Sequence, residues 1–123
     1  MASGVFVGIN GKVDSAEINR DYENSTRFDK VQVGKLGVFF RDGFKIRFMD
    51  YSLLERVFIR VQEVNLKTCC GGSTSVYFRL VFAAGGREIG EVFSENEKAM
   101  DAALAQIHEN APQIAIGFKA SNE

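Results

Sequence analysis

Cysteine, proline, histidine and tryptophan are scarce in this sequence, and the shortage of cysteine and histidine excludes two classes of protein. The 123 residues include two cysteines, one proline, one histidine and no tryptophan. Two cysteines exclude a disulfide framework, so we expect reduced thiols and a cytoplasmic location. Two cysteines and one histidine also fall short of the four ligands of a structural zinc site within one chain. We therefore expect neither a metal nor a cofactor.

Long apolar runs and an excess of one charge are also missing. No stretch approaches the ~18 apolar residues that span a bilayer, and the first residues lack the basic and apolar regions of a signal peptide. Fifteen Lys and Arg against sixteen Asp and Glu leave a net charge of -1. This balance argues against nucleic acid or an anionic membrane as the partner. We predict a single soluble domain over residues 1–123, without a transmembrane segment.

Phenylalanine and glycine are abundant, with eleven and twelve residues respectively. From about residue 31 to 93, apolar residues alternate with polar ones, as in half-buried strands. Two glycine-containing turns, 41–43 and 84–87, favour antiparallel hairpins, and Gly71 and Gly72 indicate a loop over 69–73. The apolar rows that we expect to face the core are Leu36, Val38 and Phe40; Phe44, Ile46 and Phe48; Val57, Ile59 and Val61; and Val76, Phe78, Leu80 and Phe82.

One amphipathic helix is predicted over residues 94–110. Ser94 and Glu97 have the spacing of a capping box, and Pro112 stops the helix. Its apolar stripe has helical spacing and needs a sheet to pack on: Met100, Ala103, Leu104, Ile107 and Ala111. Residues 1–30 form an N-terminal arm in which we expect a short helix over 14–24. Strands over 31–93 followed by one helix give an α+β fold.

Several motifs resemble those of a family of small uncharacterised bacterial proteins. The resemblance covers about residues 31–118 and rests on 36–43, 50–51, 55–61, 69–71, 77–82 and 111–117. It implies a pleckstrin-homology-like fold, in which a bent antiparallel barrel or sheet is capped by one C-terminal amphipathic helix. It implies no activity, substrate or catalytic residue. Such folds bind lipids, peptides and proteins, so the resemblance by itself does not choose among these ligands.

The main candidate site is the face opposite the apolar rows of two strands. It carries arginines and aromatic rings, the residue types that anchor protein interfaces: Arg56, Phe58, Arg60, Tyr77 and Arg79. Lys45, Arg47 and Met49 would join this face if their strand is a neighbour. The alternative is that the N-terminal segment or an acidic residue such as Glu63 covers the face. We predict a non-enzymatic binding module that docks a protein partner or a second copy.

A second hypothesis is an anion site formed by Lys35, Lys45 and Arg47. Their spacing matches the form of the basic residues in lipid-binding pleckstrin-homology domains, where converging cations hold phosphate groups. The tight turn at 41–43 and the balanced charge argue against this use. The alternative is an ordinary solvated strand face.

A third hypothesis is thiol-dependent redox activity at Cys69 and Cys70, which would need a thiolate stabilised by cations such as Arg60 or Lys67. The alternative is two reduced thiols in a loop. The single histidine, His108, has no nucleophile paired with it, and we expect it to be structural or solvated. No catalytic residue is therefore predicted.

Overall fold

A computed structural model describes residues 6–9, 11–13, 15–68 and 71–121 and shows an α+β protein, as predicted. Two helices and two sheets are formed by these residues. In chain order the elements are β1 (Phe6–Gly8), β2 (Gly11–Val13), α1 (Ala16–Glu23), β3 (Thr26–Phe28), β4 (Val31–Val33), β5 (Gly37–Asp42), β6 (Lys45–Asp50), β7 (Arg56–Thr68), β8 (Gly71–Ala84), β9 (Arg87–Ser94), α2 (Glu97–Asn110) and β10 (Ala115–Ser121).

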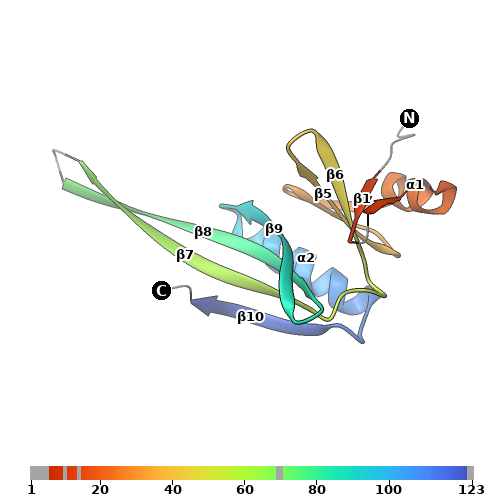
Figure 1. Ribbon diagram of the computed structural model, residues 1–123. Coiled ribbons are helices and arrows are strands. Elements are labelled where there is room, and N and C mark those ends of the chain that lie inside the picture. The colour runs from red at the N-terminus through yellow and green to blue at the C-terminus, as the bar shows by residue number, and fades with distance from the viewer. Residues whose placement is uncertain (1–5, 10, 14, 69–70, 122–123) are drawn as a thin grey trace.

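The strands form two separate sheets (Figure 1). The first sheet has the order β2-β1-β6-β5-β4-β3 and the second β10-β7-β8-β9, and over the described residues they do not close into a barrel. The hairpins are antiparallel, as their short turns require. The expectation that every pair is antiparallel is wrong for β1–β6 and β7–β10, which are parallel. Long stretches of chain separate the strands of these two pairs, which leaves room for a crossover.

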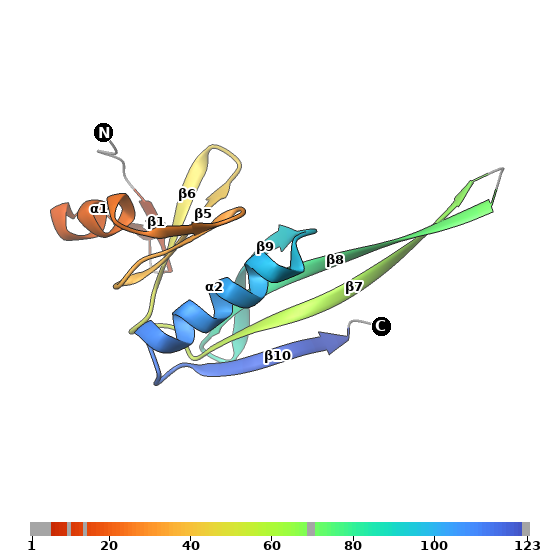
Figure 2. The same ribbon diagram turned by 180° about the vertical axis from the view of Figure 1, so that it is seen from behind.

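Helix α2 lies between the two sheets and contacts β3 and β4 on one side and β7 and β8 on the other (Figure 2). The five residues of its predicted apolar stripe are buried in one core with residues of both sheets, which confirms the stripe. Phe40 of β5 and Phe82 of β8 stack across this core with ring centroids 5.5 Å apart. The helix is not the last element, because β10 follows it and completes the second sheet.

The start of α2 differs from the predicted capping box. Asn96 is the N-cap, and its side chain accepts a hydrogen bond from the backbone N–H of Ala99 at 3.0 Å. Ser94 is instead the last residue of β9, where its hydroxyl donates to the Asp29 carboxylate and accepts from the backbone N–H of Asn96. Both residues can cap a helix, so the pattern alone placed the helix start two residues early.

The first sheet is buried on both faces, which the single apolar row did not predict. Phe39 and Phe48 pack with Phe6, α1 and the ring of Tyr22 on one face. Phe40 and Met49 face the central core on the other. Met49 is therefore buried, although its place opposite Phe48 predicted exposure. Phe44, which we expected in the apolar row, is fully exposed because it lies in the turn between β5 and β6.

A buried polar junction ties both helices to the first sheet where β4 turns into β5. The carboxylate of Asp21 in α1 accepts hydrogen bonds from the backbone N–H groups of Lys35 and Leu36 at 2.7 and 2.9 Å. The carbonyl of Gly34 accepts one from the Tyr51 hydroxyl at 2.7 Å and one from the Asn110 amide of α2 at 2.9 Å. Burial is the main cause that raises the pKa of Tyr51 to about 12.

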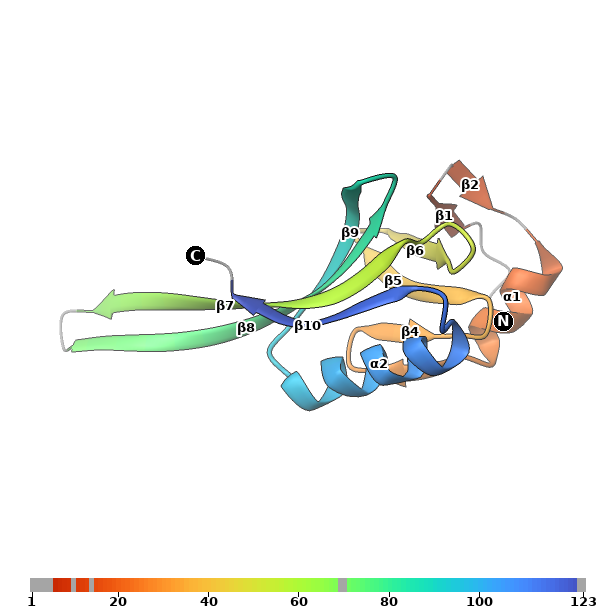
Figure 3. The same cartoon turned by 90° about the horizontal axis from the view of Figure 1, so that it is seen from below.

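Strands β7 and β8 form a hairpin that is longer than either of their neighbours. Their register runs without interruption from Arg56 opposite Ala83 to Thr68 opposite Gly71. The predicted loop over 69–73 is therefore too long, since β8 already begins at Gly71. Strand β9 pairs with β8 only from Phe78, and β10 pairs with β7 only as far as Val61. Residues 62–68 and 71–77 form a two-stranded arm that projects from the body (Figures 1 and 3).

Candidate binding face

The outer face of the second sheet, turned away from α2, brings together all five residues of the main candidate site. Arg56, Phe58 and Arg60 alternate along β7, while Tyr77 and Arg79 lie on β8. The register places Arg60 directly opposite Arg79. We call this surface the arginine–aromatic face and define it by these five residues together with Phe93, Glu88 and Glu91 of β9. The core-facing row Val57, Ile59, Phe78 and Leu80 is buried beneath it, as the alternation predicted.

Strand β9 supplies carboxylates that neutralise two of the arginines. Arg60 donates to both carboxylate oxygens of Glu88 at 3.2 and 2.5 Å, and Arg79 donates to Glu91 at 3.1 and 3.3 Å. The hydrogen bonds from Arg60 lower the pKa of the Glu88 carboxyl, and the same bonds raise the pKa of Arg60. These pairs offset the repulsion between two arginines on adjacent strands.

The aromatic rings of the face are in contact with its guanidinium groups. Phe58 is only 6% exposed and lies beneath Arg56 and Arg60, whose guanidinium carbons are 4.6 and 5.3 Å from its ring centroid. Phe93 is 39% exposed and lies 4.8 Å from the Tyr77 ring and 5.1 Å from the Arg79 guanidinium. Phe58 therefore supports the arginines from below, whereas Phe93 offers an accessible apolar surface.

One end of the face is hollowed into an open basin of about 410 Å³, with Phe58 in its lining. Three arginines and two glutamates also line the basin: Arg56, Arg60, Arg87, Glu55 and Glu88. Arg56 and Arg87 are exposed and have no carboxylate partner among the residues that the structure describes. Gly117 of β10 makes room for this arrangement, because a Cβ there would lie 2.9 Å from Phe58 Cβ and 3.4 Å from the guanidinium of Arg56.

Sequence reasoning missed the contribution of β9 to this face. The sequence predicts a strand after the turn at 84–87, but nothing in it singles out Glu88 or Glu91 as a partner of a particular arginine, or places Phe93 on this face. The Gly85-Gly86 turn, in which both residues have positive φ, is the only local signal for the register of β9, and it places Glu88 opposite Ala83. Counting further from that turn places Val92 opposite Arg79, whereas the structure has Phe93 there, because a bulge near Phe82 shifts the register by one residue.

The structure does not bring the second candidate group, Lys35, Lys45 and Arg47, together. Lys35 precedes β5 and Lys45 begins β6, so the two lie at opposite ends of this hairpin. Arg47 is engaged by Asp42, at 3.5 Å, and by the carbonyl of Ile89. Since β6 belongs to the first sheet, the expectation that Lys45, Arg47 and Met49 join the arginine–aromatic face is wrong.

The two remaining candidates of the sequence analysis are the cysteine pair and the single histidine. Cys69 and Cys70 lie outside the described residues, so the thiol hypothesis stays a prediction. His108 is exposed near the end of α2, where it lines a groove of about 320 Å³ with Leu104, Ala105 and Ile116. Across the described parts of the chain, no cluster of three His, Cys, Asp or Glu side chains is placed to hold a metal ion.

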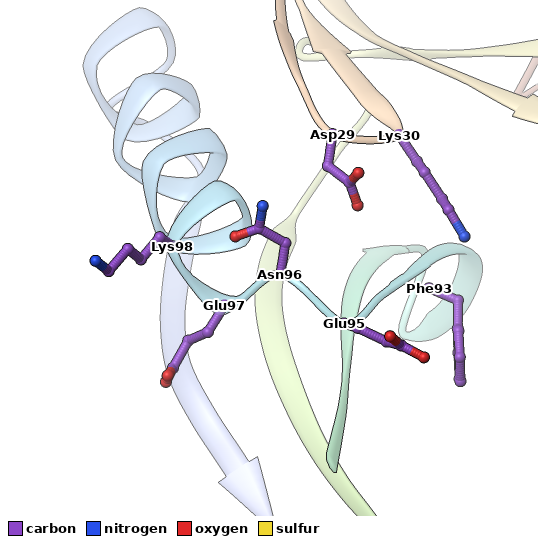
Figure 4. A pocket seen from close by; sticks show the side chains of 7 residues that line it. All are labelled: Asp29, Lys30, Phe93, Glu95, Asn96, Glu97 and Lys98. Atoms are coloured by element: carbon purple, nitrogen blue, oxygen red, sulfur yellow. The ribbon is translucent and has the colours of Figure 1, made fainter. Parts of the chain in front are cut away.

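A hollow of about 720 Å³ adjoins the face where the turn between β3 and β4 meets the start of α2 (Figure 4). Its lining mixes both charges: Asp29, Lys30, Phe93, Glu95, Asn96, Glu97 and Lys98. The Asp29 carboxylate is already bonded to Ser94, and the Asn96 side chain caps the helix. Two polar side chains of this hollow, those of Asp29 and Asn96, are therefore engaged in local structure.

Comparison with known proteins identifies the family of this chain without assigning an activity. Residues 5–123 match a protein family described as a domain of unknown function, DUF6709. The chain belongs to this family. Neither the curated proteins nor the solved structures contain a match. Within the described residues, neither helix of this family member is long and apolar enough to cross a membrane.

Proposed function

We propose that this protein is a non-enzymatic binding module that docks a protein partner on the arginine–aromatic face. The observation that carries the proposal is the open basin beside Phe58, where Arg56 and Arg87 present exposed guanidinium groups that pair with no carboxylate of the described residues. Arginine held against an aromatic ring is favoured in the buried part of interfaces, because its planar group forms paired hydrogen bonds while its stem covers apolar surface.

The charge of the basin indicates the chemistry of the partner. Three arginines and two glutamates line the basin, so its lining carries an excess of one positive charge. Glu88 is paired with Arg60, and the Glu55 carboxylate accepts a hydrogen bond from the Gly86 backbone. The two remaining guanidinium groups suit carboxylates, which they can bind in bidentate geometry. The exposed ring of Phe93 lies further along the same face. The best fit is therefore an acidic protein segment that also carries apolar side chains.

The relation to pleckstrin-homology domains and the cytoplasmic location belong to the same proposal. Two sheets that share one amphipathic helix support a pleckstrin-homology-like relationship, from which β10 and the absence of barrel closure over the described residues are departures. The shortage of cysteine supports a cytoplasmic location.

The test is a titration with a synthetic peptide of glutamate and leucine, followed by backbone amide shifts in NMR. We expect shifts concentrated around Arg56, Phe58 and Arg87, and binding that weakens with salt. Arg56→Ser together with Arg87→Ser should weaken binding about tenfold or more, the loss typical of removing interface anchors. Arg41→Ser together with Lys45→Ser is the matched control on the other sheet. Equal losses in the two double variants, or shifts spread over every basic residue, would overturn the proposal.

A further inference from the structure

The arm is a strand pair that lacks the support given to the rest of its sheet. Over the described residues, neither β9 nor β10 extends along residues 62–68 and 71–77, and α2 packs against the sheet before this point (Figure 2). An isolated two-stranded ribbon is at best marginally stable in water. Its two outer edges also expose backbone N–H and C=O groups that can pair with another strand.

The direction of these backbone groups can be followed along β8. The carbonyl of Ala83 accepts a hydrogen bond from the N–H of Glu55 and therefore faces β7. Backbone groups alternate in direction along a strand, and the β7–β8 register has no interruption. Odd-numbered residues of β8 thus face β7, and even-numbered residues face the opposite edge. Along the arm no strand of the described residues pairs with that edge, to which Gly72, Thr74 and Val76 point their N–H and C=O groups.

The open edge of β8 lacks the features that prevent strands from pairing edge to edge. Residues 71–77 contain no charge and no proline, whereas the β7 side of the arm carries Glu63 and Lys67. Two of the exposed large apolar side chains, Val76 and Phe93, lie where this edge begins, and each is 39% exposed. Of the two edges, that of β8 is therefore the one suited to association.

We propose that two copies of this chain pair through the open edges of their β8 strands. The segment 71–77 is self-complementary in antiparallel orientation about Thr74, which would lie opposite Thr74 of the second copy. Gly72 would then lie opposite Val76 of the second copy, and the reverse, as an isologous interface requires. The two arms would form one four-stranded sheet, which supplies each ribbon with the additional strands it lacks. This dimer uses backbone groups of the arm and is independent of the docking function proposed for the arginine–aromatic face.

A pair of proline variants tests this arrangement by analytical ultracentrifugation. Thr74→Pro removes an N–H that faces the open edge and costs no hydrogen bond to β7, so the chain should fold and sediment as a monomer. Asn65→Pro is the matched control, because Asn65 lies directly opposite Thr74 and its N–H faces the other edge of the arm. We expect this variant to remain a dimer. A monomeric native chain, or a dimer lost in Asn65→Pro but kept in Thr74→Pro, would overturn the proposal.

A cysteine experiment gives a readout that does not depend on proline tolerance. In the Cys69→Ser, Cys70→Ser background, Thr74→Cys should form an intermolecular disulfide on air oxidation, because paired Cα atoms in a ladder lie about 5 Å apart. Asn65→Cys should not form this disulfide. In the four-stranded sheet the two β7 strands are the outer ones, so three strand spacings, about 14 Å, would separate the two copies of residue 65. Arg56→Ser with Arg87→Ser should leave the dimer intact. Loss of the dimer in that variant would show that the face, and not the arm, joins the copies.

Discussion

At the scale of single residues, the arginine–aromatic face depends on charge neutralisation between adjacent strands. Arg60 and Arg79 lie opposite each other, and each is held by one glutamate of β9. The sequence indicates the arginines and rings through simple alternation, because Arg56, Phe58 and Arg60 occupy every second position. It does not indicate their glutamate partners, since the bulge near Phe82 changes the register of β9. The arginines and aromatic rings of the face could therefore be predicted from the sequence, whereas their ion pairs with glutamates of β9 could not.

The Glu88 carboxylate makes the stability of the protein depend on acid pH. Its pKa is lowered in the folded state, so its contribution is present above the unfolded value near 4.5 and is lost as pH falls through the lower folded value. Glu88→Gln should cost at most about 1 kcal/mol at neutral pH, because the pair is exposed, and less in high salt. Urea unfolding at neutral and acid pH measures this. The difference in free energy of unfolding between the variant and the native chain should shrink in acid, and a difference that stays constant with pH would contradict the role of this ion pair.

At the scale of elements, local patterns predicted the helices and the long strands better than the short ones. The buried stripe from Met100 to Ala111 and most of the rows of β7 and β8 followed their periodicity. Val76, which we expected to face the core, is instead 39% exposed, because it lies on the arm beyond the end of β9. Strand β10 was missed because its partner lies some sixty residues earlier in the chain, and an apolar segment of its length has no period of its own. The arm was missed because Gly71 and Gly72 are typical of loops, yet their pairing with β7 places them in a strand.

The start of α2 offers a direct test of which residue caps it. Asn96→Ala should lower the free energy of unfolding by about 1 kcal/mol, because the N–H of Ala99 loses its acceptor. Asn96→Asp keeps a side-chain oxygen at the same position and should retain the native stability. Thermal unfolding of the three proteins provides the measurement. If the aspartate variant loses as much stability as the alanine variant, the side-chain cap is not the cause.

At the scale of the whole molecule, one small junction connects elements that no short-range pattern joins. Backbone groups of residues 34–36 form hydrogen bonds with three side chains: Asp21 of α1, Tyr51, which follows β6, and Asn110, the last residue of α2. Asp21 is only 8% exposed, and a Cβ on Gly34 would lie 2.2 Å from its carboxylate. An acidic residue in a short surface helix predicts exposure, so this role was visible only in three dimensions.

Removing the Tyr51 hydroxyl tests this junction. Tyr51→Phe should cost about 1 kcal/mol at neutral pH, since one hydrogen bond to Gly34 is lost. The raised pKa of Tyr51 adds an alkaline effect: its stabilisation is complete below pH 10 and is lost as pH rises through about 12. The free energy of unfolding, measured by chemical unfolding across this range, should therefore fall less steeply with rising pH for Tyr51→Phe than for the native chain. Tyr77→Phe on the outer sheet face is the control, and an identical change there would contradict the assignment.

The place of β10 in the second sheet has a consequence for biosynthesis. Residues 115–117 pair with residues 56–58 in parallel orientation, so this side of the sheet can form only after β8, β9 and α2 have been translated. Until then the emerging polypeptide presents an open strand beside Phe58, the kind of surface that chaperones shield from aggregation. Contacts between such distant segments also slow folding. The docking surface is therefore completed late, only after nearly all of the described residues have been synthesised.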